Sequence, residues 1–356
     1  MDIFCNVIDN FGDAGFSLRL ARSLINKGIF VAIYCDDLAT LEKIATADDI
    51  KNKLLKLAPW PDAQEYQPSQ FVIEAFSCRL PSDLMSKIRK LNSIVIELDY
   101  LTAEKFAEDC HGLSSSTDGL RSFFFFPGFT SKTGGLIFDE EFKSKVEKAL
   151  LSHQNDQSTL KITVFSYENP KIKFIFNNLM RGIKKYEIKV FEGKALDNLN
   201  FQYDTMHLTT GNTVHLTNLS FFASPMSDQN IYDDILISSD LNLVRGEESA
   251  VRAMLSGKPF LWHIYPQDEN AHIVKLNALF DRMLEHLPTQ FHSNIELIRN
   301  FNLEYNGIET NTEFPLIEDF LPLWSEVTAL WAKHLFSLHS LTDNLLAFLR
   351  SKEFEQ

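Results

Sequence analysis

Basic residues are in short supply in this sequence of 356 residues. Lys and Arg together number 34 against 48 Asp and Glu, so the formal net charge at pH 7 is −14. General binding of nucleic acid or of an anionic membrane needs a basic surface, which a chain this acidic does not provide. We therefore expect neither a nucleic acid nor a membrane as a partner.

Cysteine and metal-binding patterns are also scarce. The four cysteines form no CxxC pair, and Cys5 and Cys35 lie in apolar stretches, so we expect buried, reduced thiols rather than disulfides. None of the ten histidines has the spacing of a known zinc motif, so no metal site is expected. The first residues lack the basic start of a signal peptide, and no apolar run is long enough to span a membrane. These features are typical of a cytoplasmic protein.

The composition that is present favours a folded protein of two domains. The chain is 45% hydrophobic and holds thirty Phe residues, most of which must lie in a core. The polar run from Ser152 to Ser158 is the clearest boundary. We therefore expect one domain over residues 1–150, a second over 151–335, and a terminal helix over 336–356 that packs back towards the first domain.

Strands and helices are expected to alternate in both halves. In the first half the apolar patterns predict strands at 2–8, 30–35, 71–76, 93–98 and 123–126, with helices at 16–26 and 81–90. In the second half they predict strands at 160–166, 186–191, 217–222, 241–244 and 259–262, with helices at 171–184, 229–236, 249–256, 271–286 and two more in 316–350. Two Rossmann-like α/β domains that face a cleft, followed by a helical C-terminus that crosses back, form the layout of a GT-B glycosyltransferase.

One candidate site follows the first strand. Asp9 and Asp13 lie four residues apart across a polar turn into a helix. A carboxylate pair can hold an acceptor and take a proton from it. Helix capping by an aspartate is the alternative, and for either residue alone it is the more common role.

A second candidate site follows the strand at 241–244. Arg245 and the free amides at the start of the next helix can bind a phosphate, with Glu247, Glu248 and Ser249 beside them. The alternative is a surface ion pair between Arg245 and a glutamate, with Ser249 as the N-cap. At the end of the strand at 160–166, Phe165 and Tyr167 can stack on a base or pack in the core.

Several segments resemble the EarP family, the bacterial protein-arginine rhamnosyltransferases that modify translation elongation factor P. The matching segments are Asp9-Asn10-Phe11-Gly12-Asp13, residues 98–104, 127–137, 245–253 and the long run 257–270, which contains WHIYPQDEN. They occur in the same order as in the family and cover essentially the whole chain.

The resemblance implies an inverting, metal-independent transfer of rhamnose from dTDP-β-L-rhamnose to a single arginine of elongation factor P, with no cofactor. It places Asp13 and Asp9 at the acceptor, with Asp13 as the base and with Asn10, Phe11 and Gly12 beside them. It also assigns Glu247 to catalysis, where it holds either a sugar hydroxyl or the developing positive charge. The donor contacts implied by the family are Phe165, Tyr167, Gln229, Tyr232, Arg245, Gly246, Glu248 and Ser249. At Tyr232 and Glu248 the family more often has Phe and Asp.

Two other functions fit the same patterns. One is a different GT-B glycosyltransferase or a nucleotide-sugar epimerase that uses a small-molecule acceptor. The other is a non-catalytic module that docks a translation factor. Transfer to a folded protein, with release of dTDP, would exclude both.

Overall fold

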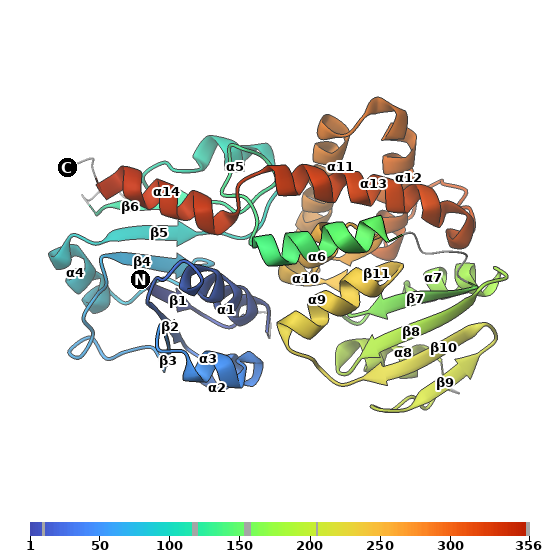
Figure 1. Cartoon of the computed structure of the whole chain (residues 1–356), viewed down its shortest axis with the longest axis horizontal. Helices are drawn as coiled ribbons and strands as arrows, with labels where there is room; N and C mark the ends of the chain where they lie inside the picture. The colour runs from blue at the N-terminus through green and yellow to red at the C-terminus, as the bar shows by residue number, and fades with distance from the viewer. Residues whose placement is uncertain (9–10, 116–119, 153–157, 204–205, 354–356) are drawn as a thin grey trace. The chain divides into compact units, whose positions relative to one another are not determined.

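The computed structural model describes residues 1–8, 11–115, 120–152, 158–203 and 206–353 (Figure 1). Contacts divide the chain into two compact units, Met1–Glu140 with Leu338–Gln356, and Glu141–Ser337. The sequence placed this boundary after residue 150, whereas the division falls after Glu140, the first residue of α6 (Glu140–Leu151). Two contacts hold this helix within the second unit. The guanidinium carbon of Arg252 lies 3.6 Å from the centre of the Phe142 ring, and Lys145 forms an ion pair with Asp234.

The first unit is built on a six-stranded parallel sheet with the order β3-β2-β1-β4-β5-β6. Its strands are β1 (Asp2–Cys5), β2 (Val31–Cys35), β3 (Leu55–Pro59), β4 (Phe71–Ala75), β5 (Ile94–Leu98) and β6 (Ser122–Phe125). Its helices are α1 (Gly12–Ile25), α2 (Leu38–Ile44), α3 (Ala47–Lys51), α4 (Ser82–Leu91), α5 (Lys105–Cys110) and α14 (Leu341–Glu353).

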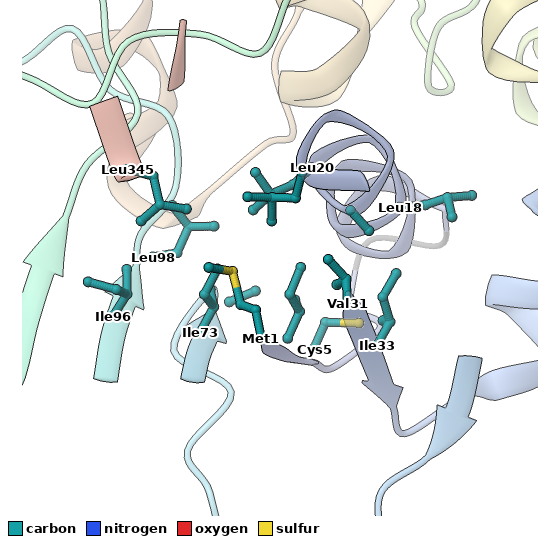
Figure 2. Close-up of a cluster of buried hydrophobic side chains, with 14 of the residues drawn as sticks. Met1, Cys5, Leu18, Leu20, Val31, Ile33, Ile73, Ile96, Leu98 and Leu345 are labelled. Atoms are coloured by element: carbon teal, nitrogen blue, oxygen red, sulfur yellow. The ribbon is translucent and has the colours of Figure 1, made fainter. Parts of the chain in front are cut away.

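The larger core of the first unit lies between the sheet and helices α1 and α14, and a second buried cluster includes Leu84 and Ile88 of α4. Figure 2 shows Leu20 of α1 and Leu345 of α14 beside strand residues such as Ile73 and Leu98, all buried. The three leucines Leu341, Leu345 and Leu349 of α14 belong to this cluster. They recur every four residues, which places them on one face of the helix. The last helix of the chain therefore completes the core of the first unit, as the expected crossing back requires.

The second unit contains a six-stranded sheet with the order β12-β11-β7-β8-β10-β9, parallel except for β9. Its strands are β7 (Thr159–Val164), β8 (Lys185–Phe191), β9 (Thr213–Leu216), β10 (Leu219–Ser224), β11 (Leu241–Arg245) and β12 (Phe260–His263). Besides α6 its helices are α7 (Ile172–Met180), α8 (Lys194–Gln202), α9 (Gln229–Ser238), α10 (Gly246–Leu255), α11 (Ala271–His286), α12 (His292–Tyr305) and α13 (Ile317–Ser337), with 3₁₀ turns at Asp268–Asn270 and Thr289–Phe291.

The main strands and helices predicted from the sequence are present, and α11 has the predicted bounds. The sequence missed β3 and β9, which lie at sheet edges, several short helices, and the longer helices α6 and α12. The four cysteines are free, and three of them are buried. No helix in the part of the chain that the structure describes is long and apolar enough to cross a membrane.

Candidate active site

Each sheet has one point where the direction of strand succession reverses. In the second unit the chain runs from β7 to β8 and β10 on one side, then returns to add β11 and β12 on the other. The loops that follow β7 and β11 therefore start side by side at the carboxyl edge of the sheet, at the kind of reversal where α/β proteins bind ligands. Phe165 and Tyr167 follow β7, and Arg245 ends β11. The structure thus brings together the two segments that the sequence assigned to the donor.

Arg245 lies against aromatic rings rather than against a carboxylate. Its guanidinium carbon is 4.4 Å from the centre of the Phe165 ring and 4.9 Å from that of Tyr167. No ion pair or hydrogen bond of this half-buried guanidinium is found among the described residues. The surface ion pair considered as an alternative from the sequence is therefore not formed there. Cation–π contacts orient the guanidinium and leave its five N–H donors for an anion.

Gly246 makes the turn from β11 into α10. Its φ is +61°, a left-handed conformation that glycine adopts without strain. Its carbonyl accepts a hydrogen bond of 2.6 Å from the Trp262 indole, which ties the turn to β12. The helix therefore begins at 246 and not at 249 as predicted, and Ser249 is a buried residue inside it rather than its N-cap. The N-cap residue, Arg245, makes no side-chain capping bond, so the first-turn amides are not capped by it and favour a phosphate.

Helix α9 is fixed beside α10 by a buried ion pair. Arg252 donates from Nε and Nη2 to the two carboxylate oxygens of Asp233, at 2.9 and 2.7 Å. Gln229 is the first residue of α9. Tyr232 contacts the Phe165 ring, with ring centres 5.6 Å apart. The structure therefore brings Tyr232 into contact with Phe165, one of the two rings that contact Arg245.

The Tyr232 phenol faces the same helix start. Burial raises its pKa, and the neighbouring Ser249 hydroxyl and the Arg245 charge act in the opposite direction. The phenol oxygen is buried, and the Ser249 hydroxyl does not meet it with the geometry of a hydrogen bond. Glu248 acts on the phenol by its negative charge. Tyr232, Glu248 and Ser249 thus form a polar group around one buried hydroxyl.

Glu247 has a partner that the sequence did not predict. Its carboxylate accepts a short hydrogen bond from the ammonium of Lys275, on α11. Both side chains are largely buried, at 26% and 15% exposed. The two residues lie 28 positions apart in sequence, so only the tertiary fold brings them together. The lysine neutralises a negative charge that would otherwise repel an anion at the start of α10.

His263 is a second residue that the sequence left unassigned. It ends β12 opposite Arg245 in the sheet and is only 6% exposed. Its ring centre lies 5.5 Å from that of Tyr167, and its Nδ1 meets no hydrogen-bond partner among the residues that the structure describes. Burial, with smaller effects of His272 and Arg245, lowers the pKa of His263 to about 4. The imidazole is therefore neutral at pH 7, which avoids a second positive charge next to Arg245.

Asp13 lies at the matching point of the first unit, after β1, where the order of strands reverses between β1 and β4. It is in the first turn of α1 and only 4% exposed, and its Oδ2 accepts a hydrogen bond of 2.9 Å from the amide of Ile8. The N-cap of α1 is Phe11, without a side-chain capping bond, and Gly12 is the first helical residue. The N-cap role considered for Asp13 is therefore not what the structure shows. Asp9 and Asn10 lie outside the described residues.

A cavity of about 330 Å³ lies at the carboxyl ends of β4 and β5 in the same sheet. Its lining residues are Glu74, Ser77, Arg79, Glu97, Leu98, Asp99 and Phe124. Burial, and next the charge of Glu97, raise the pKa of Glu74 to about 6. Three carboxyl groups give this cavity an acidic lining, which suits a cationic side chain. Within the described ranges no group of three or more His, Cys, Asp or Glu side chains is placed to hold a metal ion.

The two α/β units, each with one such reversal of strand order, have the fold of the GT-B class of glycosyltransferases. One solved structure with this fold is the glycosyltransferase VinC in complex with dTDP, with a TM-score of 0.50, 12% identity, and coverage of 99% of this chain and 100% of that one. At this level of identity the likeness concerns the fold alone.

The chain belongs to the EarP family, since the model of the elongation factor P (EF-P) rhamnosyltransferase EarP matches residues 1–350. The protein-arginine rhamnosyltransferase of Pseudomonas aeruginosa is 32% identical to it, over 98% of both chains. A solved structure from work on EarP-mediated arginine glycosylation of EF-P has a TM-score of 0.64 and 23% identity, and the match covers 98% of each chain. The resemblance found from the sequence motifs is therefore confirmed.

Proposed function

We propose that this chain transfers rhamnose from dTDP-β-L-rhamnose to one arginine side chain of elongation factor P, with inversion at the anomeric carbon and without a metal ion or cofactor. Family membership supports the reaction and the protein acceptor. The observation that carries the donor assignment is Arg245, a half-buried guanidinium held on two aromatic rings at the start of α10.

The donor residues act on the leaving group. As the bond between the anomeric carbon and the diphosphate oxygen breaks, negative charge grows on dTDP. Arg245 and the first amides of α10 stabilise that charge in the position where it develops, and they need no rearrangement to do so. Gly246 allows the close approach of backbone to phosphate, because it carries no side chain at the turn. Phe165 and Tyr167 orient the Arg245 guanidinium through cation–π contacts.

The acceptor residues act on the arginine. A guanidinium has a pKa above about 12 and is a poor nucleophile, and a nearby carboxylate stabilises the cation further. Asp13 therefore orients the guanidinium and accepts its proton as the new C–N bond forms. General-base assistance of this kind gives a rate increase of about 10²–10⁴-fold, and positioning adds to it. The acidic cavity beside β4 and β5 supports a cationic acceptor on this unit.

Glu247 has two roles open to it, and its ion pair favours one of them. A carboxylate already neutralised by Lys275 is a weak counter-charge for an oxocarbenium-like carbon. It remains a good hydrogen-bond acceptor, because it has lone pairs that the ammonium does not use. We therefore assign Glu247 to a hydroxyl of the sugar.

The test is intact-mass spectrometry of elongation factor P from the same organism after incubation with this protein and dTDP-β-L-rhamnose. The expected result is a gain of one deoxyhexose that maps to a single arginine. Inversion is checked by NMR of the anomeric carbon in the product, and metal independence by repeating the reaction in EDTA.

Other outcomes would redirect the proposal. No mass gain from a folded protein that still binds dTDP would indicate a different acceptor, such as a small molecule. Failure to bind dTDP as well would contradict the assignment of Arg245 and α10 to the donor.

A further inference from the structure

We infer that Lys194 is a second cation of the donor site and that it binds the diphosphate of the nucleotide together with Arg245. This inference rests on the proposed donor function and adds a residue that neither the motifs nor the family resemblance pointed to. Lys194 is the first residue of α8, and it follows the carboxyl end of β8, the neighbour of β7. It therefore lies at the same edge of the sheet as Tyr167 and Arg245.

Tyr167 connects the two cations. The ammonium nitrogen of Lys194 lies 5.6 Å from the centre of the Tyr167 ring, and the Arg245 guanidinium carbon lies 4.9 Å from the same centre. The Tyr167 ring is itself 5% exposed and held edge-on by His263 and Tyr265. A fixed ring thus has two positive side chains in contact with it.

Lys194 has no carboxylate partner that would explain its position. No hydrogen bond or ion pair of its ammonium is found within the described residues. Glu192, two residues before Lys194 in sequence, is engaged elsewhere, because its Oε1 accepts from the amide of Met226 at 3.0 Å and its Oε2 from the Thr210 hydroxyl at 3.3 Å. Lys194 also lies in the first turn of a helix, where a cation is disfavoured by the helix dipole. An anion bound at Tyr167 would remove that penalty.

The charge of the leaving group requires more than one cation. A nucleoside diphosphate carries more than one negative charge, and without a metal ion the protein must balance it with side chains and amides. Arg245 presents a planar fork that suits two oxygens of one phosphate, while a lysine is a point charge on a flexible stem. Lys194 is exposed and can move on its four-carbon stem, so it can follow the second phosphate as the bond to the sugar breaks.

The test compares the binding of dTDP and thymidine by titration calorimetry and by ligand-observed NMR competition. In Lys194→Gln we expect the Kd of dTDP to rise by about threefold to tenfold, since one charge-assisted contact is lost. The Kd of thymidine should not change, because it carries no phosphate. The salt dependence of dTDP binding should also become weaker than in the unmodified protein.

Lys185→Gln is the matched control. Lys185 is exposed, begins β8 at the opposite edge of the sheet, and its replacement changes the net charge by the same amount. We expect it to leave the binding of dTDP unchanged. Thermal melting confirms that each variant is folded.

The outcomes separate this inference from the donor function itself. If Lys194→Gln binds dTDP as the unmodified protein does while Arg245→Gln does not, Lys194 has no role and the donor site stands. If Lys194→Gln weakens dTDP and thymidine equally, its effect is structural and the inference is wrong. If the unmodified protein does not bind dTDP, the donor function fails and the inference fails with it.

Discussion

Single residues in this protein act through the groups placed around them. Arg245 is held by rings that orient it without neutralising it, whereas Glu247 is neutralised by a lysine. Asp13 is buried and accepts a backbone amide, so its carboxylate is fixed in direction. The type of each side chain determines its charge and its hydrogen-bonding groups. The neighbouring groups determine which of these remain available to a ligand.

The role of Asp13 can be tested by Asp13→Asn. The amide keeps an oxygen that can accept the Ile8 N–H, so we expect the fold to be retained. Rhamnose transfer should fall by about 10²–10⁴-fold, because the amide cannot take the arginine proton. The measurement is the rate of mass gain of the acceptor, with dTDP binding as a check that the donor unit is intact.

Asp36→Asn is the control for this substitution. Asp36 accepts the amide of Val7 at 2.8 Å, so it supports the same segment of chain as Asp13 while being exposed. We expect near-normal transfer from it. Normal transfer from Asp13→Asn would rule out Asp13 as the base.

His263 predicts a dependence of stability on pH. Its pKa is about 4 in the native state, against about 6.5 when unfolded, so the unfolded chain binds more protons between these values. The stability that the neutral imidazole contributes is present above pH 6.5 and is lost as the pH falls towards 4. The native state should lose about 2 kcal/mol from this group between pH 8 and pH 5.

Substitution His263→Phe should remove that part of the pH dependence. The ring can still pack against Tyr167 and Tyr305, and no hydrogen bond of Nδ1 is lost. Urea unfolding of both proteins at pH 8 and pH 5 measures the difference. An identical loss of stability in the two proteins would mean that His263 does not titrate as its burial implies.

Pairs of elements determine the geometry of the donor site. Strand β11 and helix α10 join at Gly246, and the helix start is supported from two sides. Arg252 pairs with Asp233 to hold α9, and Glu247 pairs with Lys275 on α11. A change in α9 or α11 should therefore affect ligand binding through its ion pair with α10.

The contact between α10 and α11 can be tested with Lys275→Gln. Removing the ammonium takes away a positive charge that pairs with the Glu247 carboxylate at the proposed diphosphate site, so dTDP should bind more weakly. The double variant Glu247→Gln with Lys275→Gln should recover much of the affinity, because the repelling charge is gone. Calorimetric titration of the two single variants and the double variant measures the coupling. Additive effects would show that the pair does not act on the ligand.

At the scale of the whole molecule, the chain leaves the first unit and returns to it. Residues 1–140 form the sheet, and residues 338–356 add α14 to its core. The leucines of α14 are buried against residues more than 200 positions away in sequence. The first unit is therefore complete only when the end of the chain has been made.

Because α14 packs into the core of the first unit, we expect Leu345→Ala to lower the stability of the protein strongly. Leu345 is fully buried between α14 and the sheet (Figure 2), so its truncation should destabilise the protein by about 2–5 kcal/mol. Leu346→Ala, at a partly buried neighbour on the same helix, should cost clearly less. Chemical denaturation of both variants measures this, and equal losses would show that α14 is not part of the core.

The sequence by itself predicted the α/β class and most strands and helices. It also pointed to Arg245, Phe165 and Tyr167 as candidate donor residues, which the structure brings into contact. Apolar runs gave the central strands because parallel strands are buried on both faces. The edge strands β3 and β9 were missed because their patterns are mixed, as the exposed Lys56 and Thr213 show. The sequence motifs were enough to find the family, whose model matches residues 1–350.

Only the tertiary structure decided which partners these residues have. Lys275 meets Glu247, and Lys194 meets Tyr167, across separations that no local pattern encodes. The start of α10 at Gly246 depends on a left-handed turn held by Trp262, which overrode the expected cap at Ser249. Local sequence sets the conformations that a segment prefers, but ion pairs, burial and shifted pKa values arise from groups that are close in space and distant in sequence.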